Sequence, residues 1–409
     1  MSGGRISSPV RGARTRPAFD AHPVLHRLRR SLRHAAPALY GYAATRLVLL
    51  ALLVFRAGPH HTVTRLASDW DARWYARIVR FGYGGSSHLY NVHHVEYSAR
   101  AFFPLFPALA TPFHQLLPVS AGVALLVVSW TSGLVAAWGI HACAAFCHSR
   151  RVGVAAAVLW GVLPLAAVES MAYSESLFTA FCAWSLYAVL RRRWIWAGSL
   201  CLLAGLTRPN AMALTGALGV AALVELYRRW RDGAGLVAPW RPLAGMLLAP
   251  LGWLGYILWT GWTQGSWGAY FHIQDAWGSS FDGGWSTLHW VEALPQHYHG
   301  GRGDSVNNLL MAATVLAALV LFGWALRRRQ PLPLVLFSGL MLVMDLGDAS
   351  PYPPLARFLI PAFPLLFPLA EQLTRSVRNR WTLAALLAML ALCSGYYGID
   401  LVFFAGAPS

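Results

Sequence analysis

The stretch SDWDARWYARIVRFGYG, residues 68–84, carries Asp69 and Asp71 among tryptophans and arginines. It follows an apolar run at 37–57, which matches the length of about 20 residues that crosses a lipid bilayer as a helix. Carboxylates at the point where a spanning helix returns to water can face an aqueous substrate and a lipid headgroup together. The interpretation of the whole chain therefore depends on what surrounds this stretch.

Composition indicates a membrane protein. The chain has 409 residues and is 56% hydrophobic and 12% charged, with a mean hydropathy of +0.46. Soluble domains carry about twice that charged fraction. The net charge of +17 comes from arginine, because the chain contains no lysine. The arginines cluster between apolar runs, which favours topology determinants over a nucleic-acid surface, so we expect a lipid bilayer and no nucleic acid as partner.

About eleven apolar segments predict an all-α, polytopic transmembrane protein. Several are shorter than the length that spans a bilayer unaided. The two segments that meet at LTRPNA (206–211) are predicted to be two short spans or one broken helix. The segments are 37–57, 119–147, 152–168, 174–190, 194–207, 209–227, 243–262, 306–326, 331–347, 355–373 and 381–404.

The arginine clusters predict the topology, because loops on the cytoplasmic side of a membrane are enriched in Arg and Lys. With a cytoplasmic N-terminus, the inner clusters lie at 27–33, 150–151, 191–193, 228–231, 327–329 and 375–380. Two long loops, 58–118 and 263–305, then lie on the outer face of what we expect to be a bacterial plasma membrane. The inner loops are too short for a soluble catalytic domain, so chemistry is expected on the outer face.

The chain is predicted to contain one folded domain and one tail. Residues 1–36 are polar and basic, and we expect a disordered cytoplasmic tail there. The end of this tail, VLHRLRRSLRH (24–34), has the pattern of a short basic helix on the inner leaflet. Residues 37–405 form the predicted transmembrane domain.

The first outer loop contains a predicted interfacial helix. Trp74, Ile78 and Phe81 follow one another at spacings of four and three, as on one face of a helix that lies along a membrane. Gly82 is expected to end this helix, and Asp71 then lies near its start. One interpretation is that Asp69 or Asp71 only caps the helix. The alternative is a catalytic carboxylate placed beside Trp70, Trp74 and Tyr75.

Five motifs give the chain a resemblance to a known family. Residues 38–405 resemble the PIG-V family, the GPI mannosyltransferase II family with its bacterial relatives, which belongs to the GT-C glycosyltransferases. The first two motifs, in this order and spacing, are the specific ones. The motifs are WDARWYARIVRFGYG (70–84), FFPLFPAL (102–109), YSESLF (173–178), LTRPNA (206–211) and ARFLIPAFPLL (356–366).

The resemblance implies a GT-C-like fold and transfer of mannose from a polyprenyl-phosphate-mannose donor at the outer face. It implies that Asp71, the aspartate after a tryptophan, is the catalytic base. Asp69 is offset from the family pattern, and its role stays open. The acceptor is not identified and can be a glycan, a glycolipid or a protein. We expect no cofactor besides the lipid-linked donor, and a metal requirement is open.

The chemistry of such a donor needs few groups. A sugar that leaves a lipid phosphate departs from a stable anion, so one base that deprotonates the acceptor hydroxyl is sufficient. Direct displacement inverts the anomeric centre. Cations are needed for the phosphate, and guanidinium groups bind phosphate in a bidentate manner. Arg357, near the outer end of a span, and Arg208, at the predicted helix break, are the first candidates.

The remaining candidates have ordinary structural alternatives. Arg46 lies inside the first span, where a charge is costly, so it either pairs with a polar group or helps to hold the donor. Glu175 can be a simple helix-start carboxylate, and Arg208 can pair with Glu169 or Glu175. The substrate-binding candidates are Trp70, Trp74, Tyr75, Glu175 and Asn210.

Two other function classes remain open from the sequence. A transporter or lipid flippase shares the apolar composition, but it predicts repeated halves, and no internal repeat is evident. A GT-C enzyme with another lipid-linked sugar donor is hardly separable by sequence. The concentration of polar residues in one asymmetric outer loop favours the enzyme.

Overall fold

The computed structural model describes residues 22–85, 87–91, 94–233, 240–297, 302–349 and 355–403. In this part of the chain the secondary structure is helical, apart from two isolated β-bridges that pair Tyr90 with Glu96 and Phe281 with Asp348. The prediction of an all-α fold is therefore confirmed.

Six helices of the described residues, counting α10 and α11 as one, are long and apolar enough to cross a membrane. They are α1 (His22–Ala57), α5 (Ala121–Cys147), α9 (Ala211–Arg231), α10 with α11 (Trp240–Leu248, Leu251–Gln264), α14 (Arg302–Arg327) and α18 (Arg380–Phe403). Three shorter apolar helices accompany them: α7 (Glu175–Leu190), α8 (Trp194–Gly205) and α15 (Leu332–Leu346). Side chains such as Phe55, which is 92% exposed, face outward, as expected where lipid covers the surface. The chain is an integral membrane protein.

The other helices connect or flank these. They are α2 (Pro59–Ser68), α3 (Asp71–Phe81), α4 (Leu105–Leu116), α6 (Arg150–Trp160), α12 (Ala269–Ala276), α13 (Trp285–His297), α16 (Leu355–Phe358) and α17 (Leu366–Ser376). Three short 3₁₀ turns are η1 (Ala99–Ala101), η2 (Ala166–Ser170) and η3 (Phe363–Leu365).

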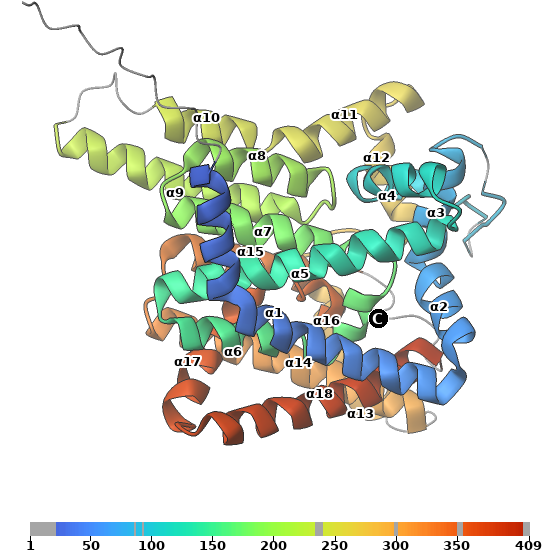
Figure 1. Ribbon diagram of the computed structural model, residues 1–409. Coiled ribbons are helices and arrows are strands. Elements are labelled where there is room, and N and C mark those ends of the chain that lie inside the picture. Colours follow the sequence, from blue (N-terminus) through green and yellow to red (C-terminus); the bar gives the residue numbers. More distant parts are fainter. Residues whose placement is uncertain are drawn as a thin grey trace, which may run out of the picture.

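The two loops predicted to lie on one side of the membrane contact each other. In Figure 1, α2, α3, α4 and α12 gather at the same end of the long helices, on the right of the view. The Asn91 side chain in the first loop donates to the Ala276 carbonyl at 3.1 Å, and Trp74 packs edge-on against Trp277. The two loops therefore build a common cover over that end of the bundle.

The helix predicted in the first loop is present as α3. Its inward face buries Trp74, Tyr75 and Ile78, while Phe81 is exposed. Gly82 ends the helix with a φ of 68°, a left-handed conformation that glycine adopts without steric cost. The helix packs between α4 and α5, so its first turn is held against the interior of the bundle.

Three predicted boundaries were wrong. The first helix begins at His22, so residues 22–36 are not part of a disordered tail. The helix predicted at 24–34 is present as the first part of α1, where Leu25, Leu28 and Leu32 continue the helical spacing toward the span. Residues 1–21 lie outside the described residues, and their predicted disorder stays a prediction.

The other two boundaries concern predicted segments 152–168 and 355–373. The first forms α6 and then an irregular stretch with η2, and the second forms α16, η3 and α17. Prolines at 164, 361 and 364 remove backbone donors there and interrupt the helices. The predicted break at LTRPNA does separate α8 from α9, and a further break at Pro250 separates α10 from α11.

Candidate active site

Asp71 lies at the junction between α2 and α3. It is the first residue of α3, and Trp70 before it has a φ of 48°, which a bulky side chain seldom adopts. The Asp71 backbone N–H donates to the Tyr173 hydroxyl at 3.3 Å. The start of α3 has no side-chain cap, so the interpretation of Asp71 as a helix cap was wrong.

The Asp71 carboxylate pairs with Arg357. Nη2 of Arg357 lies 2.9 Å from Oδ2 of Asp71, and Nε lies 3.3 Å from Oε1 of Glu175. Arg357 comes from α16 and Glu175 is the first residue of α7, so three segments that are distant in sequence meet here. The Glu175 side chain is fully buried, whereas that of Asp71 is 21% exposed. Asp71 is thus the carboxylate of this group that a substrate can reach.

Arg208 continues the row of charges from the break between α8 and α9. Its Nη1 lies 2.7 Å from Oε1 of Glu175 and donates to Oγ of Ser174 at 3.1 Å. The Ser174 hydroxyl also shares a hydrogen bond of 2.8 Å with the Tyr75 hydroxyl on α3. Glu175 therefore sits between two arginines, and Ser174 links Arg208 to the helix that carries Asp71.

Aromatic rings enclose both guanidinium groups. The Arg357 guanidinium carbon lies 5.3 Å from the centre of the Tyr173 ring and 5.0 Å from that of Phe358. The Arg208 guanidinium lies 5.1 Å from the Phe358 ring. Such cation–π contacts hold a planar guanidinium in a fixed orientation. The phosphate-binding candidates are thus rigidly placed rather than mobile at a surface.

Burial and neighbouring charges together shift pKa values at this site. Burial opposes the charge on Arg357, but Asp71 and Glu175 outweigh this effect and raise its pKa above the usual value. Burial also raises the pKa of Tyr75 and the pKa of Tyr173. Both tyrosines therefore remain protonated hydroxyls at neutral pH and cannot act as bases.

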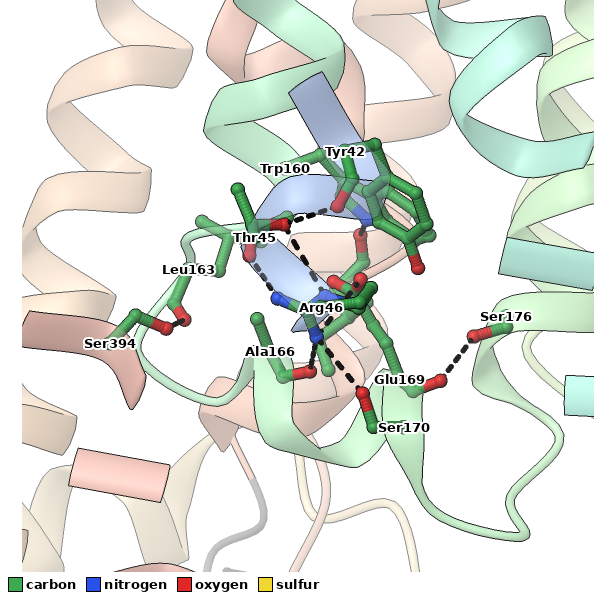
Figure 2. A network of polar contacts seen from close by, with 12 residues as sticks. Tyr42, Thr45, Arg46, Trp160, Leu163, Ala166, Glu169, Ser170, Ser176 and Ser394 are labelled. Carbon is green, nitrogen blue, oxygen red and sulfur yellow. Dashed lines mark hydrogen bonds and ion pairs between the residues drawn. The ribbon is translucent and has the colours of Figure 1, made fainter. Parts of the chain in front are cut away.

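Arg46 belongs to a separate network, shown in Figure 2. From α1 it donates to the carbonyls of Gly161 and Ala166 and lies 3.6 Å from the Glu169 carboxylate. Its Nη1 also reaches the Ser170 hydroxyl at 3.5 Å. These contacts satisfy the backbone of the irregular stretch between α6 and α7. The structure thus gives Arg46 a pairing role with Glu169, the first of the two alternatives from the sequence.

This irregular stretch leads directly into the site. The Glu169 carbonyl accepts hydrogen bonds from Ser129 and Ser176, and the Ala172 N–H donates to the Leu66 carbonyl of α2 at 2.8 Å. Tyr173, Ser174 and Glu175 follow at once. The network around Arg46 therefore positions the part of the chain that carries these three side chains.

The other sequence candidates lie nearby with different contacts. Asp69 follows the last residue of α2 and pairs with Arg65 at 3.0 Å in a partly buried contact. Trp74 packs against Phe102 and Trp277 in an aromatic cluster. Trp70 is the N-cap residue of α3 and Asn210 that of α9.

Sequence reasoning missed four neighbours of the site. Tyr173 and Ser174 belong to the quoted YSESLF motif but were not singled out, and Phe358 follows Arg357 directly. Asp345, at the end of α15, is buried and close enough to Arg208 to interact with it electrostatically. Its signal was a lone carboxylate in an otherwise apolar run. Among the described residues, no three His, Cys, Asp or Glu side chains group as a metal site.

Comparison with known proteins gives structural matches only. Neither a scan against protein-family models nor a search of curated proteins found a match. The crystal structure of ArnT from Cupriavidus metallidurans bound to undecaprenyl phosphate matches with a TM-score of 0.51 and 16% identity, over 87% of this chain and 63% of that one. The chain therefore shares the overall fold of this ArnT structure.

Two further structures match less well. The apo state of the same ArnT gives a TM-score of 0.49 at 17% identity, over 78% of this chain and 58% of that one. The archaeal oligosaccharyltransferase AglB from Archaeoglobus fulgidus, in complex with an inhibitory peptide and a dolichol-phosphate, gives a TM-score of 0.47 at 14% identity. The match covers 91% of this chain and 56% of that one. The chain thus spans less than two thirds of the length of these proteins.

Proposed function

We propose that this protein is a membrane glycosyltransferase that moves a mannosyl residue from a polyprenyl-phosphate donor to an acceptor hydroxyl, with Asp71 as general base. The observation that carries the proposal is the position of the Asp71 carboxylate, partly exposed and 2.9 Å from Arg357. A base beside a fixed cation is what transfer from a lipid phosphate requires, because the acceptor must lose a proton while the leaving phosphate gains a second negative charge.

The proposed reaction assigns a role to each charged residue of the site. The acceptor hydroxyl gives its proton to Asp71, its oxygen bonds to the anomeric carbon, and the bond from that carbon to the phosphate oxygen breaks. The leaving polyprenyl phosphate keeps the electron pair and needs no proton. Arg357 and Arg208 supply the positive charge for that phosphate, and Glu175 holds both guanidinium groups in place. The direct displacement inverts the anomeric centre.

The choice of donor rests on two supports. The matched ArnT structure contains undecaprenyl phosphate, which makes a polyprenyl phosphate a reasonable carrier for a chain of the same fold. The quoted motifs resemble the PIG-V mannosyltransferases, which favours mannose over other sugars. We propose that the donor tail lies among the apolar helices and that the acceptor, a glycan, glycolipid or protein, approaches from the outer face.

The test uses purified full-length protein in nanodiscs with radiolabelled polyprenyl-phosphate-mannose. Release of mannose to water or to an added acceptor is measured for the wild type and for Asp71→Asn, which keeps the shape of the side chain and removes the base. Asp69→Asn is the matched control, because Asp69 lies two residues away and pairs with Arg65 on its own helix turn rather than with Arg357. Donor binding is measured separately for each protein.

We expect Asp71→Asn to lower turnover by about 100- to 10,000-fold with donor binding retained, the range that general-base catalysis supplies. Asp69→Asn is expected to stay near the wild-type rate. Equal turnover for Asp71→Asn would remove Asp71 from the mechanism. A wild type that neither binds nor consumes this donor would favour another lipid-linked sugar, or the transport of a lipid or solute.

A further inference from the structure

Tyr173 contacts both members of the pair formed by Asp71 and Arg357. Its hydroxyl accepts a hydrogen bond from the Asp71 backbone N–H at 3.3 Å, and its ring centre lies 5.3 Å from the guanidinium carbon of Arg357. The residue is fully buried, at 0% exposed. The reaction proposed above gives Tyr173 no role, although its two ends contact the base and the cation of that reaction.

The hydrogen bond satisfies a donor that α3 cannot satisfy itself. Asp71 is the first residue of this helix, and the N–H groups of the first turn of a helix have no acceptor within the helix. The N-cap residue, Trp70, supplies no side-chain acceptor either. The Tyr173 hydroxyl, from the segment before α7, takes that place. The direction in which α3 starts, and with it the position of the Asp71 side chain, therefore depends on Tyr173.

The backbone before Asp71 is strained and is held from both sides. Trp70 has a φ of 48°, which is costly for a bulky residue and persists only where the surrounding structure holds it. On one side, the Ala172 N–H donates to the Leu66 carbonyl of α2 at 2.8 Å. On the other side, Tyr173 accepts from Asp71. Two consecutive residues of the segment before α7 thus hold the junction between α2 and α3.

The ring of Tyr173 has a second, separable contact. It lies against the Arg357 guanidinium, which also contacts the Phe358 ring at 5.0 Å. Cation–π contacts of this kind orient a planar guanidinium group. The same guanidinium lies 2.9 Å from the Asp71 carboxylate. Removal of the hydroxyl alone would release the Asp71 backbone and leave the ring on Arg357, so the two contacts can be tested one at a time.

We infer that Tyr173 is a positioning residue that fixes the base and the phosphate-binding cation relative to each other: its hydroxyl places Asp71, and its ring orients Arg357. The inference rests on the proposed function. A catalytic group works only within a narrow range of positions relative to the reacting atoms, so a small displacement of the base costs a large factor in rate. The hydroxyl therefore acts on the chemical step, and the ring acts on binding of the donor phosphate.

The test compares the wild type with Tyr173→Phe, which removes only the hydroxyl, and with Tyr173→Leu, which also removes the ring. The kcat and the KM for polyprenyl-phosphate-mannose are measured separately in nanodiscs, and thermal stability is recorded for every protein. Tyr256→Phe is the matched control. Tyr256 is also buried, and its hydroxyl shares its proton between the carbonyls of Arg100 and Phe102, at 2.9 and 3.0 Å, in the first outer loop.

We expect Tyr173→Phe to lower kcat by about 10- to 100-fold at an unchanged donor KM, the cost of a misplaced catalytic group. Tyr173→Leu should lower kcat at least as much and should also raise the donor KM by about 2- to 30-fold, the worth of a cation–π contact. Tyr256→Phe should keep the kcat and KM of the wild type, even if its Tm falls as far as that of Tyr173→Phe.

A double variant separates positioning of the base from a general loss of structure. If the Tyr173 hydroxyl acts through Asp71, Tyr173→Phe should cost no further activity once Asp71→Asn has removed the base. Losses that multiply in the double variant, a wild-type kcat for Tyr173→Phe, or an equal fall of kcat in Tyr256→Phe would overturn the inference. Full activity of Asp71→Asn, or a wild type inactive on this donor, would instead count against the proposed function.

Discussion

Arg357 joins the one partly exposed carboxylate of the site, Asp71, to the fully buried Glu175. Nη2 contacts Asp71 at 2.9 Å and Nε lies 3.3 Å from Glu175, so the two ends of one planar group fix the distance between two helix starts. A lysine in this place could contact either carboxylate but could not reproduce the fork. The geometry therefore makes a specific demand on the side chain, beyond its charge.

Arg357→Lys should consequently fail nearly as badly as Arg357→Met. We expect kcat/KM for the lipid-linked donor to fall by about 100-fold or more in both variants, because a fixed cation is lost or displaced from the leaving phosphate. Arg357→Met should also raise the KM for the donor. Steady-state kinetics with polyprenyl-phosphate-mannose measure both effects.

The control for this prediction is Arg65→Met, which breaks the Arg65–Asp69 ion pair at the end of α2. This is a partly exposed pair within one helical turn, and such i,i+4 pairs contribute only about 0.3–0.5 kcal/mol, so activity and stability should stay close to those of the wild type. If Arg357→Lys retained wild-type kinetics, the fork would have no function and a simple charge would suffice.

We expect substitution of Arg46 to lower the stability of the fold more than the catalytic rate. Arg46→Met removes the hydrogen bonds to the Gly161 and Ala166 carbonyls and leaves Glu169 buried without its cation. Breaking a buried ion pair by removal of one partner costs about 3–5 kcal/mol, so the Tm in detergent should drop clearly. Arg46→Met combined with Glu169→Gln removes both charges and should recover part of that loss. A double variant less stable than Arg46→Met would exclude the pairing as the cause.

The sequence predicted the candidate site residues better than the residues that contact them. Asp71, Glu175 and Arg208 occupy recognisable motifs and proved to be neighbours in space. Arg46 could be identified as costly within a span, yet its partner Ala166 lies 120 residues away, and no local pattern encodes such a contact. Asp345 was missed for the same reason, because its neighbour Arg208 becomes visible only when α15 packs against the site.

The prediction of the helices was limited in the same way, by contacts between distant parts of the chain. Long apolar runs such as 119–147 were predicted correctly, because length and composition alone determine a spanning helix. Segment 152–168 is equally apolar but bends after Trp160, where the Ser394 hydroxyl and Arg46 satisfy the carbonyls of Leu163 and Ala166. Side chains from distant helices replace the helical hydrogen bonds there, and composition does not reveal this substitution.

Close approach of α8 and α11 depends on Gly252. A Cβ at this position would collide with the backbone carbonyl of Leu202, which cannot move aside as a flexible side chain could. Gly252→Ala should therefore force the helices apart and destabilise the protein by about 1–3 kcal/mol, the usual cost of overpacking. Thermal unfolding in detergent measures this. Gly255→Ala, on the same helix with open space around its Cβ, should be neutral or slightly stabilising, and equal losses in both would refute the steric argument.

Asp282 makes the start of α13 sensitive to pH. Its carboxylate accepts from the backbone N–H groups of Gly284 at 2.8 Å, Trp285 at 3.1 Å and Ser286 at 2.7 Å. Hydrogen bonds from Ser286, and then from Gly284 and Trp285, lower the pKa of Asp282 below its usual value. A lowered carboxyl pKa means that the stabilisation is present above the ordinary value of about 4 and is lost as the pH falls through the lower, folded value.

The variant Asp282→Ala should then exchange the amide hydrogens of residues 284–286 faster than the wild type at neutral pH, because three donors lose their acceptor. The difference between the two proteins should shrink as the pH falls through the lowered pKa of Asp282, where the wild-type carboxylate becomes protonated. Asp282→Asn keeps an oxygen acceptor without a titratable charge, so its protection should change less with pH than that of the wild type. Hydrogen exchange of these amides, measured by mass spectrometry over this pH range, tests the prediction. An Asp282→Ala variant with wild-type exchange rates at neutral pH would show that the Asp282 carboxylate does not stabilise the start of α13.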